Sequence, residues 1–118
     1  MSDYKKHLPE LLLTDHEYHA LKEIKESVTD KFEVERFILF GSIVRGEANE
    51  ESDIDLLIVT KRPLTRWERH QITDTVCEIN LEYGTNFSTL VVDSYTWDRG
   101  SVSLLSIHQE VEREGVLV

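Results

Sequence analysis

Two apolar runs separated by one polar loop constrain this chain more strongly than any other feature. Residues 36–40 (RFILF) have the β-branched and aromatic composition of a buried strand, and they end at the turn signal Gly41-Ser42. Residues 53–60 (DIDLLIVT) form a second apolar run that begins with two carboxylates, and the polar segment 43–52 lies between the runs. The pattern therefore predicts a strand, a loop of about ten residues and a second strand.

Segments with helical spacing flank this strand pair. A capping-box pattern at residues 14–17 begins a predicted helix over residues 15–31. A second capping box, at residues 65–68, begins a helix that ends near Gly84. The apolar positions with helical spacing are Leu21, Ile24, Val28 and Phe32 in the first helix and Ile72, Val76, Ile79 and Tyr83 in the second.

The remaining segments complete an alternating pattern of strands and helices. Residues 86–93 form the third predicted strand. In the tail, Ser94 and Ser101 are candidate helix caps, Gly115 is a helix stop, and residues 116–118 form a last short strand. The helical spacing of the tail rests on Leu104, Ile107 and Val111. The order α, β, β, α, β, α, β predicts an α+β fold, a short mixed sheet flanked by helices.

Length and charge limit the partners of the chain. A length of 118 residues predicts one domain over residues 1–118. With 23 acidic and 13 basic residues the net charge is −10, which opposes binding to long nucleic acid. A triphosphate site in this chain needs metal ions and backbone N–H groups to offset the repulsion. Because no apolar run approaches a membrane span and no signal peptide is recognisable, we expect a cytoplasmic protein without a membrane partner.

Asp53 and Asp55 are the candidate metal ligands. They project from the same face of the second predicted strand, because successive side chains of a strand alternate between faces. Carboxylates this close repel each other and are usually compensated by a cation. Mg²⁺ commonly combines one or two carboxylates with phosphate oxygens, and Mn²⁺ favours similar oxygen ligands. The pair therefore predicts a divalent metal site.

Gly41, Ser42 and Arg45 are the candidate phosphate-binding residues. Glycine allows a sharp turn and a close approach of ligand to backbone, and Ser42 offers a hydroxyl and an N–H group. The Arg45 guanidinium is close enough in sequence to bind phosphate oxygens in a forked geometry. A Gly-Ser turn or an Asp-x-Asp pair alone is common in turns and caps, but their combination at this spacing is specific.

The segment FGSIVRGEANEESDIDLLIV resembles the signature of minimal nucleotidyltransferases of the DNA polymerase beta superfamily, and the likeness covers residues 37–59. The resemblance implies a polymerase-beta-like nucleotidyltransferase fold. It also implies that Gly41 and Ser42 contact a nucleoside triphosphate, and that the catalytic residues Asp53 and Asp55 hold one or two Mg²⁺ ions, with Mn²⁺ as an alternative. The implied reaction transfers a nucleoside monophosphate, AMP from ATP in the first instance, to a hydroxyl group and releases pyrophosphate.

One position departs from the family's pattern. The family usually has a third carboxylate on a later strand, and the usual separation leads to Ser88, which carries no charge. Asp93 is the alternative third metal ligand, although alternation assigns it to the opposite face of the strand unless a bulge intervenes. Asp93 could instead end the strand or cap a helix. The rival interpretation is therefore a catalytically weakened module that binds a nucleotide or a partner.

The acceptor is suggested only by resemblance. Small members with this signature resemble antitoxins that pair with HEPN-type toxins, a family of helical ribonucleases, and transfer AMP to a tyrosine of the toxin. The acidic composition suits a basic protein partner, and the sequence leaves a homo-oligomer open. Antibiotic-modifying enzymes that resemble this family generally carry an extra helical domain, which we do not expect in a chain with one predicted domain.

Other conspicuous side chains have simpler explanations. Cys77 is expected to be a buried thiol, His16 and His19 to lie on a solvated face, and Trp67 and Trp97 to pack in amphipathic helices. A basic run follows the metal strand, and it predicts either a solvated helix start or a contact with phosphate or a partner. The run consists of Lys61, Arg62, Arg66 and Arg69.

Overall fold

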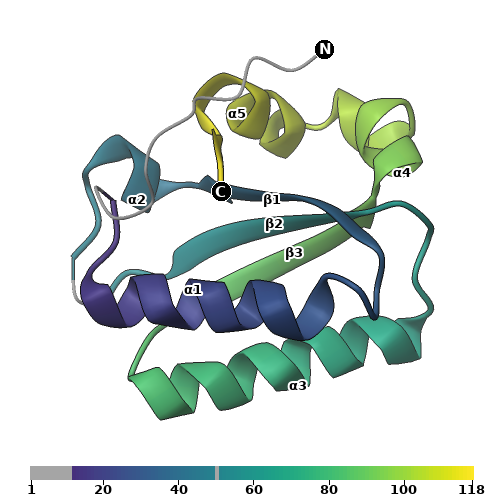
Figure 1. The fold of residues 1–118 in the computed structure, drawn as a ribbon. Coiled ribbons are helices and arrows are strands. Elements are labelled where there is room, and N and C mark those ends of the chain that lie inside the picture. Colours follow the sequence, from purple (N-terminus) through teal and green to yellow (C-terminus); the bar gives the residue numbers. More distant parts are fainter. Residues whose placement is uncertain (1–11, 50) are drawn as a thin grey trace.

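A computed structural model describes residues 12–49 and 51–118, which form a mixed four-stranded sheet with helices on both faces (Figure 1). The sheet has the order β3-β2-β1-β4. Strand β1 is antiparallel to β2 and β4, whereas β2 is parallel to β3. The strands are β1 (Val34–Phe40), β2 (Ile54–Thr60), β3 (Phe87–Asp93) and β4 (Val116–Leu117). The predicted α+β fold with a mixed sheet is confirmed.

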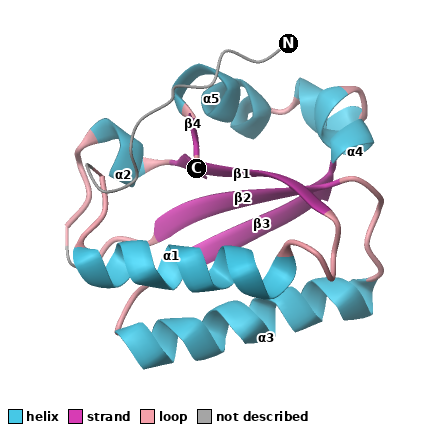
Figure 2. Ribbon diagram, viewed as in Figure 1, coloured by secondary structure: helices cyan, strands magenta, loops and turns pink. Residues whose placement is uncertain are grey.

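Helices cover the two faces of the sheet unequally. The long helices α1 (Asp15–Val28) and α3 (Arg66–Tyr83) lie on one face (Figure 2). The shorter helices α4 (Ser94–Asp98) and α5 (Ser106–Glu114), joined through the 3-10 helix η2 (Ser101–Leu104), lie on the other. None of the helices among residues 12–49 and 51–118 combines the length and the apolar composition of a membrane span.

Alternation along β1 and β2 gives each face its own core. The face toward α1 and α3 buries Phe37, Leu39, Leu56 and Ile58. The face toward α4 and α5 buries Ile38, Phe40, Leu57 and Val59, together with Trp97 and Val111. Because alternate residues of a strand share a face, Asp55 lies on the same face as Leu57 and Val59. Asp55 therefore faces the layer that contains α5.

Both predicted capping boxes form. Thr14 and Glu17 cap α1 reciprocally, and Thr65 and Glu68 do the same for α3. Helix α3 ends at Gly84, as predicted, in the left-handed conformation. Helix α1 ends at Val28 rather than at residue 31, although Phe32 of the following turn still packs in the core.

The tail differs most from its prediction. Residues 94–114 form three short helical segments instead of one helix, and Leu104 is 82% exposed rather than part of the core. The caps differ as well, because Asp93 rather than Ser94 accepts the capping hydrogen bond of α4. A glycine, Gly100, precedes η2 without a side-chain cap, so Ser101 is not a cap. The close packing of Gly100 against the backbone of Thr96 separates the first two segments.

Candidate active site

The antiparallel pairing of β1 and β2 brings the Gly-Ser turn to the Asp pair. Phe40, the last residue of β1, is opposite Asp55, and Gly41 follows Phe40 directly. Asp53 immediately precedes Ile54, the first residue of β2. The two halves of the predicted motif therefore lie side by side at one end of the sheet, although a polar loop separates them in the sequence.

Gly41 has the backbone that the turn requires. Its φ of 78° and ψ of −154° fall in a region that is essentially restricted to glycine. A Cβ atom added to Gly41 would overlap Oδ2 of Asp55 and lie 3.2 Å from its Cγ. The Asp55 carboxylate therefore rests directly against the turn, and only glycine permits this approach.

The predicted loop contains a short helix that sequence reasoning missed. Residues Ser42–Arg45 form α2, which ends at Gly46 in the left-handed conformation with φ 72°. Ser42 is thus the first residue of a helical turn, where N–H groups lack intrahelical acceptors and can bind an anion. The four-residue SIVR segment is too short to show helical periodicity in the sequence.

Asp53 is held by a residue that sequence reasoning also missed. The Asn86 side chain donates a hydrogen bond from Nδ2 to Oδ1 of Asp53 at 2.7 Å. The backbone carbonyl of Asn86 accepts from the N–H of Ile54 at 2.9 Å, so the same residue fixes the start of β2. Asn86 is thereby a positioning residue for Asp53. The parallel register of β2 and β3 brings Asn86 to Asp53, and no local sequence motif predicts this contact.

Asp55 is half-buried and lies among other carboxylates. Burial is the main reason that its pKa is raised above the usual value, and the charges of Asp53 and Glu110 raise the pKa further. The positive charge of Arg45 acts in the opposite direction. The net effect disfavours the ionised form, so a cation bound at Asp55 would relieve an existing electrostatic cost.

The predicted third ligand does not join the pair. Asp93 is opposite Thr60, at the other end of the parallel ladder from Asp55, and this separation corresponds to about 17 Å along a strand. Its Oδ2 and Oδ1 accept from the backbone N–H and the hydroxyl of Thr96 at 3.0 and 2.7 Å, so Asp93 is a helix cap. These hydrogen bonds help to lower its pKa below the usual value against the opposing effect of burial.

Ser88 occupies the place next to Asp55 on the neighbouring strand. The register of β2 and β3 pairs the two residues directly. Among residues 12–49 and 51–118, no group of three or more His, Cys, Asp or Glu side chains is arranged to hold a metal ion. The donor set at this end of the sheet is therefore the pair of Asp53 and Asp55, which suits a cation that completes its shell with phosphate oxygens and water.

Arg45 is bound by three carboxylates. Its Nε donates to Glu47 at 3.1 Å, and its Nη1 contacts Glu110 at 3.0 Å and Glu114 at 3.1 Å. Hydrogen bonds to these carboxylates raise its pKa further, and the guanidinium lowers the pKa of Glu114. Glu110 and Glu114 come from α5, far along the sequence, so the prediction for Arg45 did not include them.

The predictions for the other conspicuous side chains are confirmed in part. His16 and His19 are exposed and Trp97 is fully buried, as predicted. Cys77 is exposed rather than buried, because it follows the core residue Val76 and therefore points away from the core face of α3. Trp67 is 72% exposed and does not pack. It belongs to the first turn of α3, which precedes the buried positions of that helix.

Comparison with known proteins identifies the family of the chain. The model of the nucleotidyltransferase domain family matches residues 21–98. A relative from Methanocaldococcus jannaschii, named as a candidate protein adenylyltransferase, is 40% identical over 79 residues. That match covers 64% of this chain and 54% of the relative, so the chain spans about half of the relative's length.

Solved structures have the same fold. A candidate minimal nucleotidyltransferase is similar with a TM-score of 0.57 and 22% identity, over 86% of this chain and 92% of that one. A toxin–antitoxin structure with AMP-PNP is similar with a TM-score of 0.57 and 18% identity, over 84% of this chain and 69% of that one. Identities this low extend the likeness to the fold and no further.

Proposed function

Since the chain belongs to the nucleotidyltransferase domain family, we propose that it transfers AMP from ATP to a hydroxyl group of a protein and releases pyrophosphate. The observation that carries the proposal is the contact of the Asp55 carboxylate with the Gly41 turn, next to Asp53. A phosphate-binding turn and two oxygen donors then serve one ligand. The name of the 40% identical relative supports AMP as the transferred group and a protein as the acceptor.

Asp53 and Asp55 would hold a divalent cation, Mg²⁺ or Mn²⁺. Both aspartates offer carboxylate oxygens as ligands, and the raised pKa of Asp55 reflects in part the repulsion by neighbouring carboxylates, which a cation would remove. When bound, the cation supplies neutralisation of the triphosphate and of the departing pyrophosphate. The N–H groups at the Gly41-Ser42 turn would bind phosphate oxygens, and Asn86 would keep Asp53 in place.

The proposed step is a phosphoryl-type displacement that needs no protein nucleophile. The acceptor hydroxyl oxygen forms a bond to the α-phosphorus, while the bond from that phosphorus to the bridging oxygen of the β-phosphate breaks. Pyrophosphate leaves with the bonding electrons, and the hydroxyl proton passes to solvent. The protein contributes position and charge compensation, which are the main sources of rate in this type of transfer.

A HEPN-type toxin is the acceptor protein that we propose. The resemblance of the motif to antitoxins supports it, as does the fold of the toxin–antitoxin structure with AMP-PNP. The acidic chain, with a net charge of −10, would attract a basic partner. The hydroxyl of a tyrosine on that partner would be the attacking group.

A second function is favoured by one observation, the serine next to Asp55. Because Ser88 supplies no charge, the cation that activates the acceptor hydroxyl would be held more weakly than the cation that accompanies the triphosphate. The alternative is thus a module that binds nucleotide and partner without efficient transfer. The two functions share the same nucleotide site and differ only in turnover.

Transfer of label from α-labelled ATP distinguishes the two functions. The wild type is incubated with Mg²⁺, labelled ATP and the protein encoded beside it, and compared with Asp53→Ala/Asp55→Ala. The matched control is Asp74→Ala/Glu78→Ala, which removes two exposed carboxylates of α3 on the opposite face of the sheet. The proposal expects labelled acceptor and pyrophosphate from the wild type and the control, and neither product from the Asp53/Asp55 variant.

Absence of transfer together with Mg²⁺-dependent ATP binding would replace the first function by the second. In that case Ser88→Asp, which restores a carboxylate beside Asp55, is expected to produce measurable transfer. If neither the wild type nor Ser88→Asp binds ATP, both functions are wrong.

A further inference from the structure

The outer edge of β3 is open. In the described part of the chain, β3 is the first strand of the order β3-β2-β1-β4, and no strand pairs with its outer side. Its sequence, FSTLVVD, contains no lysine, proline or glycine, which are the residues that usually protect an edge. An unprotected edge exposes N–H and C=O groups that can pair with an extended segment of another chain.

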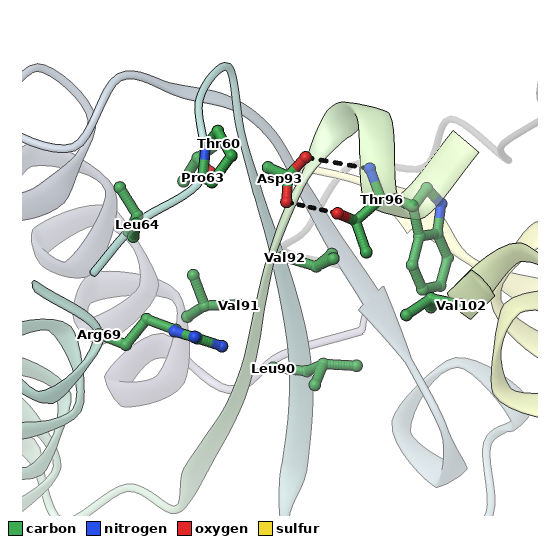
Figure 3. Close-up of a pocket in the computed structure, with 11 residues that line it drawn as sticks. Thr60, Pro63, Leu64, Arg69, Leu90, Val91, Val92, Asp93, Thr96 and Val102 are labelled. Carbon is green, nitrogen blue, oxygen red and sulfur yellow. Dashed lines mark hydrogen bonds between the residues drawn. The ribbon is translucent and has the colours of Figure 1, made fainter. Parts of the chain in front are cut away.

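A cavity of about 410 Å³ lies along this edge (Figure 3). Leu90 and Val91 point to opposite sides of β3, and Val102 and Leu64 line the cavity from either side of the strand. Leu90 is 39% exposed, which is unusual for a leucine in the middle of a strand. The cavity can therefore accept an apolar side chain of a segment that lies next to β3.

Arg69 provides the charge at this cavity. It reaches from α3 toward β3 (Figure 3), and no hydrogen bond or ion pair joins its guanidinium to another described residue. By contrast, the guanidinium groups of Arg45 and Arg62 are each bound by more than one carboxylate. The carboxylate of the cavity itself, Asp93, is already bound to Thr96.

The positive surface extends beyond Arg69. Arg66 and His70 line a neighbouring depression that shares Arg69 with the cavity. In a chain with a net charge of −10, this local group of basic side chains favours a ligand of negative charge. A carboxylate can accept a forked pair of hydrogen bonds from the free guanidinium.

From this edge and this charge we propose that an extended acidic segment of a partner protein pairs with the outer edge of β3. The segment would seat an apolar side chain in the cavity and a carboxylate on Arg69. A second copy of the chain fits less well, because it would bring a second Arg69, which no described carboxylate binds, and a further net charge of −10.

The surface continues to the candidate active site. Ser88, which is opposite Asp55, lies two residues before Leu90 on the same side of β3, about 7 Å along the strand. A segment paired with β3 would therefore lead past Asp55. This consequence rests on the proposed function, whereas the pairing itself does not.

Selection from a random dodecapeptide library displayed on phage tests the pairing. The full chain is the bait, and three variants are compared with the wild type. Leu90→Lys places a charge on the edge, Arg69→Glu reverses the charge of the cavity, and Leu81→Lys is the matched control on an 86% exposed leucine of α3. Enriched peptides are synthesised, and their affinities and their effect on the amide signals of residues 88–92 are measured.

The proposal expects peptides with alternating apolar residues and at least one Asp or Glu. They should bind the wild type and Leu81→Lys equally and lose binding to Leu90→Lys. Replacing the acidic residue by lysine should weaken binding to the wild type by about two- to fivefold, the usual effect of an exposed ion pair, and strengthen binding to Arg69→Glu. Asp53→Ala/Asp55→Ala should select the same peptides, so a failure of transfer leaves this result unchanged.

Three results would overturn the proposal. One is selection of peptides without acidic residues, or of none above background. Another is binding that Leu90→Lys leaves intact. The third is a concentration-dependent dimer of the wild type that Leu90→Lys dissociates, which would identify a second copy as the occupant of the edge.

Discussion

Replacement of Gly41 by alanine tests the contact on which the candidate site depends. The φ of 78° and ψ of −154° at Gly41 would strain any other residue by about 1–3 kcal/mol. The new Cβ would also overlap Oδ2 of Asp55, and overpacking of this kind costs about 1–3 kcal/mol. Because the half-buried carboxylate can rotate partly away, the lower end of the second range applies. We expect Gly41→Ala to lower the free energy of unfolding by about 2–4 kcal/mol.

Gly46→Ala is the matched control for backbone strain. Gly46 also has a positive φ, 72°, but no atom lies within 4 Å of the position of an added Cβ. Its conformation is left-handed helical, for which alanine costs about 1–2 kcal/mol. The difference between the two losses of unfolding free energy measures what the contact with Asp55 adds to the backbone strain at Gly41.

Asp55→Ala identifies the partner in a double-mutant cycle. It removes the atoms that overlap and keeps Cβ, which lies 3.5 Å from the added atom, an ordinary contact. Gly41→Ala should therefore cost about 1 kcal/mol less in this background than in the wild type. Urea denaturation followed by the fluorescence of the buried Trp97 gives all four free energies. Equal penalties for Gly41→Ala in both backgrounds, no larger than that of Gly46→Ala, would refute the contact.

Three further predictions follow from burial and charge. The pKa of Asp55 is raised, chiefly by burial and then by the charge of Asp53, so ionisation of Asp55 lowers the stability of the fold as pH rises above 3.8. Asp55→Asn should therefore have a larger free energy of unfolding than the wild type at pH 7 and the same free energy below pH 3.8. A difference between the two proteins that does not change between these pH values would contradict the raised pKa. The hydrogen bonds from Arg62 lower the pKa of Glu68 from 4.5 to about 2. The wild type should therefore be more stable than Glu68→Gln above pH 4.5, and this difference in the free energy of unfolding should disappear as pH falls to 2. A difference that persists at pH 2 argues against the ion pair. Trp97→Ala removes a fully buried side chain and should lower the free energy of unfolding by about 3–5 kcal/mol. Trp67→Ala, at a 72% exposed position, should change it by about 0.5 kcal/mol or less. Similar losses for the two variants in urea denaturation would contradict the difference in burial.

The elements that the sequence predicted well are those determined by local chemistry. The capping boxes at Thr14 and Thr65 and the stop at Gly84 depend on residues three or four positions apart, and all three form. The strands β1 and β2 contain apolar runs with many β-branched and aromatic residues, and this composition predicts strands rather than helices. In the tail, α4 and η2 are too short to show periodicity, so the sequence does not separate them. Helix α5 is longer, and the spacing of Ile107 and Val111 and the stop at Gly115 do predict it.

The candidate site divides in the same way. The turn at Gly41 follows from a motif, and the face on which Asp55 lies follows from strand alternation. The contacts of Asn86 and of Glu110 depend on which strands are neighbours and where α5 packs, and these are properties of the tertiary structure. The sequence makes Asp93 a candidate ligand because it is a carboxylate on the third strand. Only the register shows that it lies at the wrong end.

Ser88 connects the two proposals, because one change at this position has opposite expected effects on them. A carboxylate there would be a direct strand neighbour of Asp55, at the about 4.7–4.9 Å that separates adjacent strands, and could help to hold the cation. The same charge would stand on the exposed edge of β3 and repel an acidic segment. Serine neither binds the cation as a carboxylate would nor repels an acidic segment. The present sequence therefore favours binding at the edge of β3 and weakens binding of the cation. Ser88→Asp should therefore increase transfer and weaken the binding of acidic peptides, and a change of both in the same direction would mean that the edge and the site are not independent.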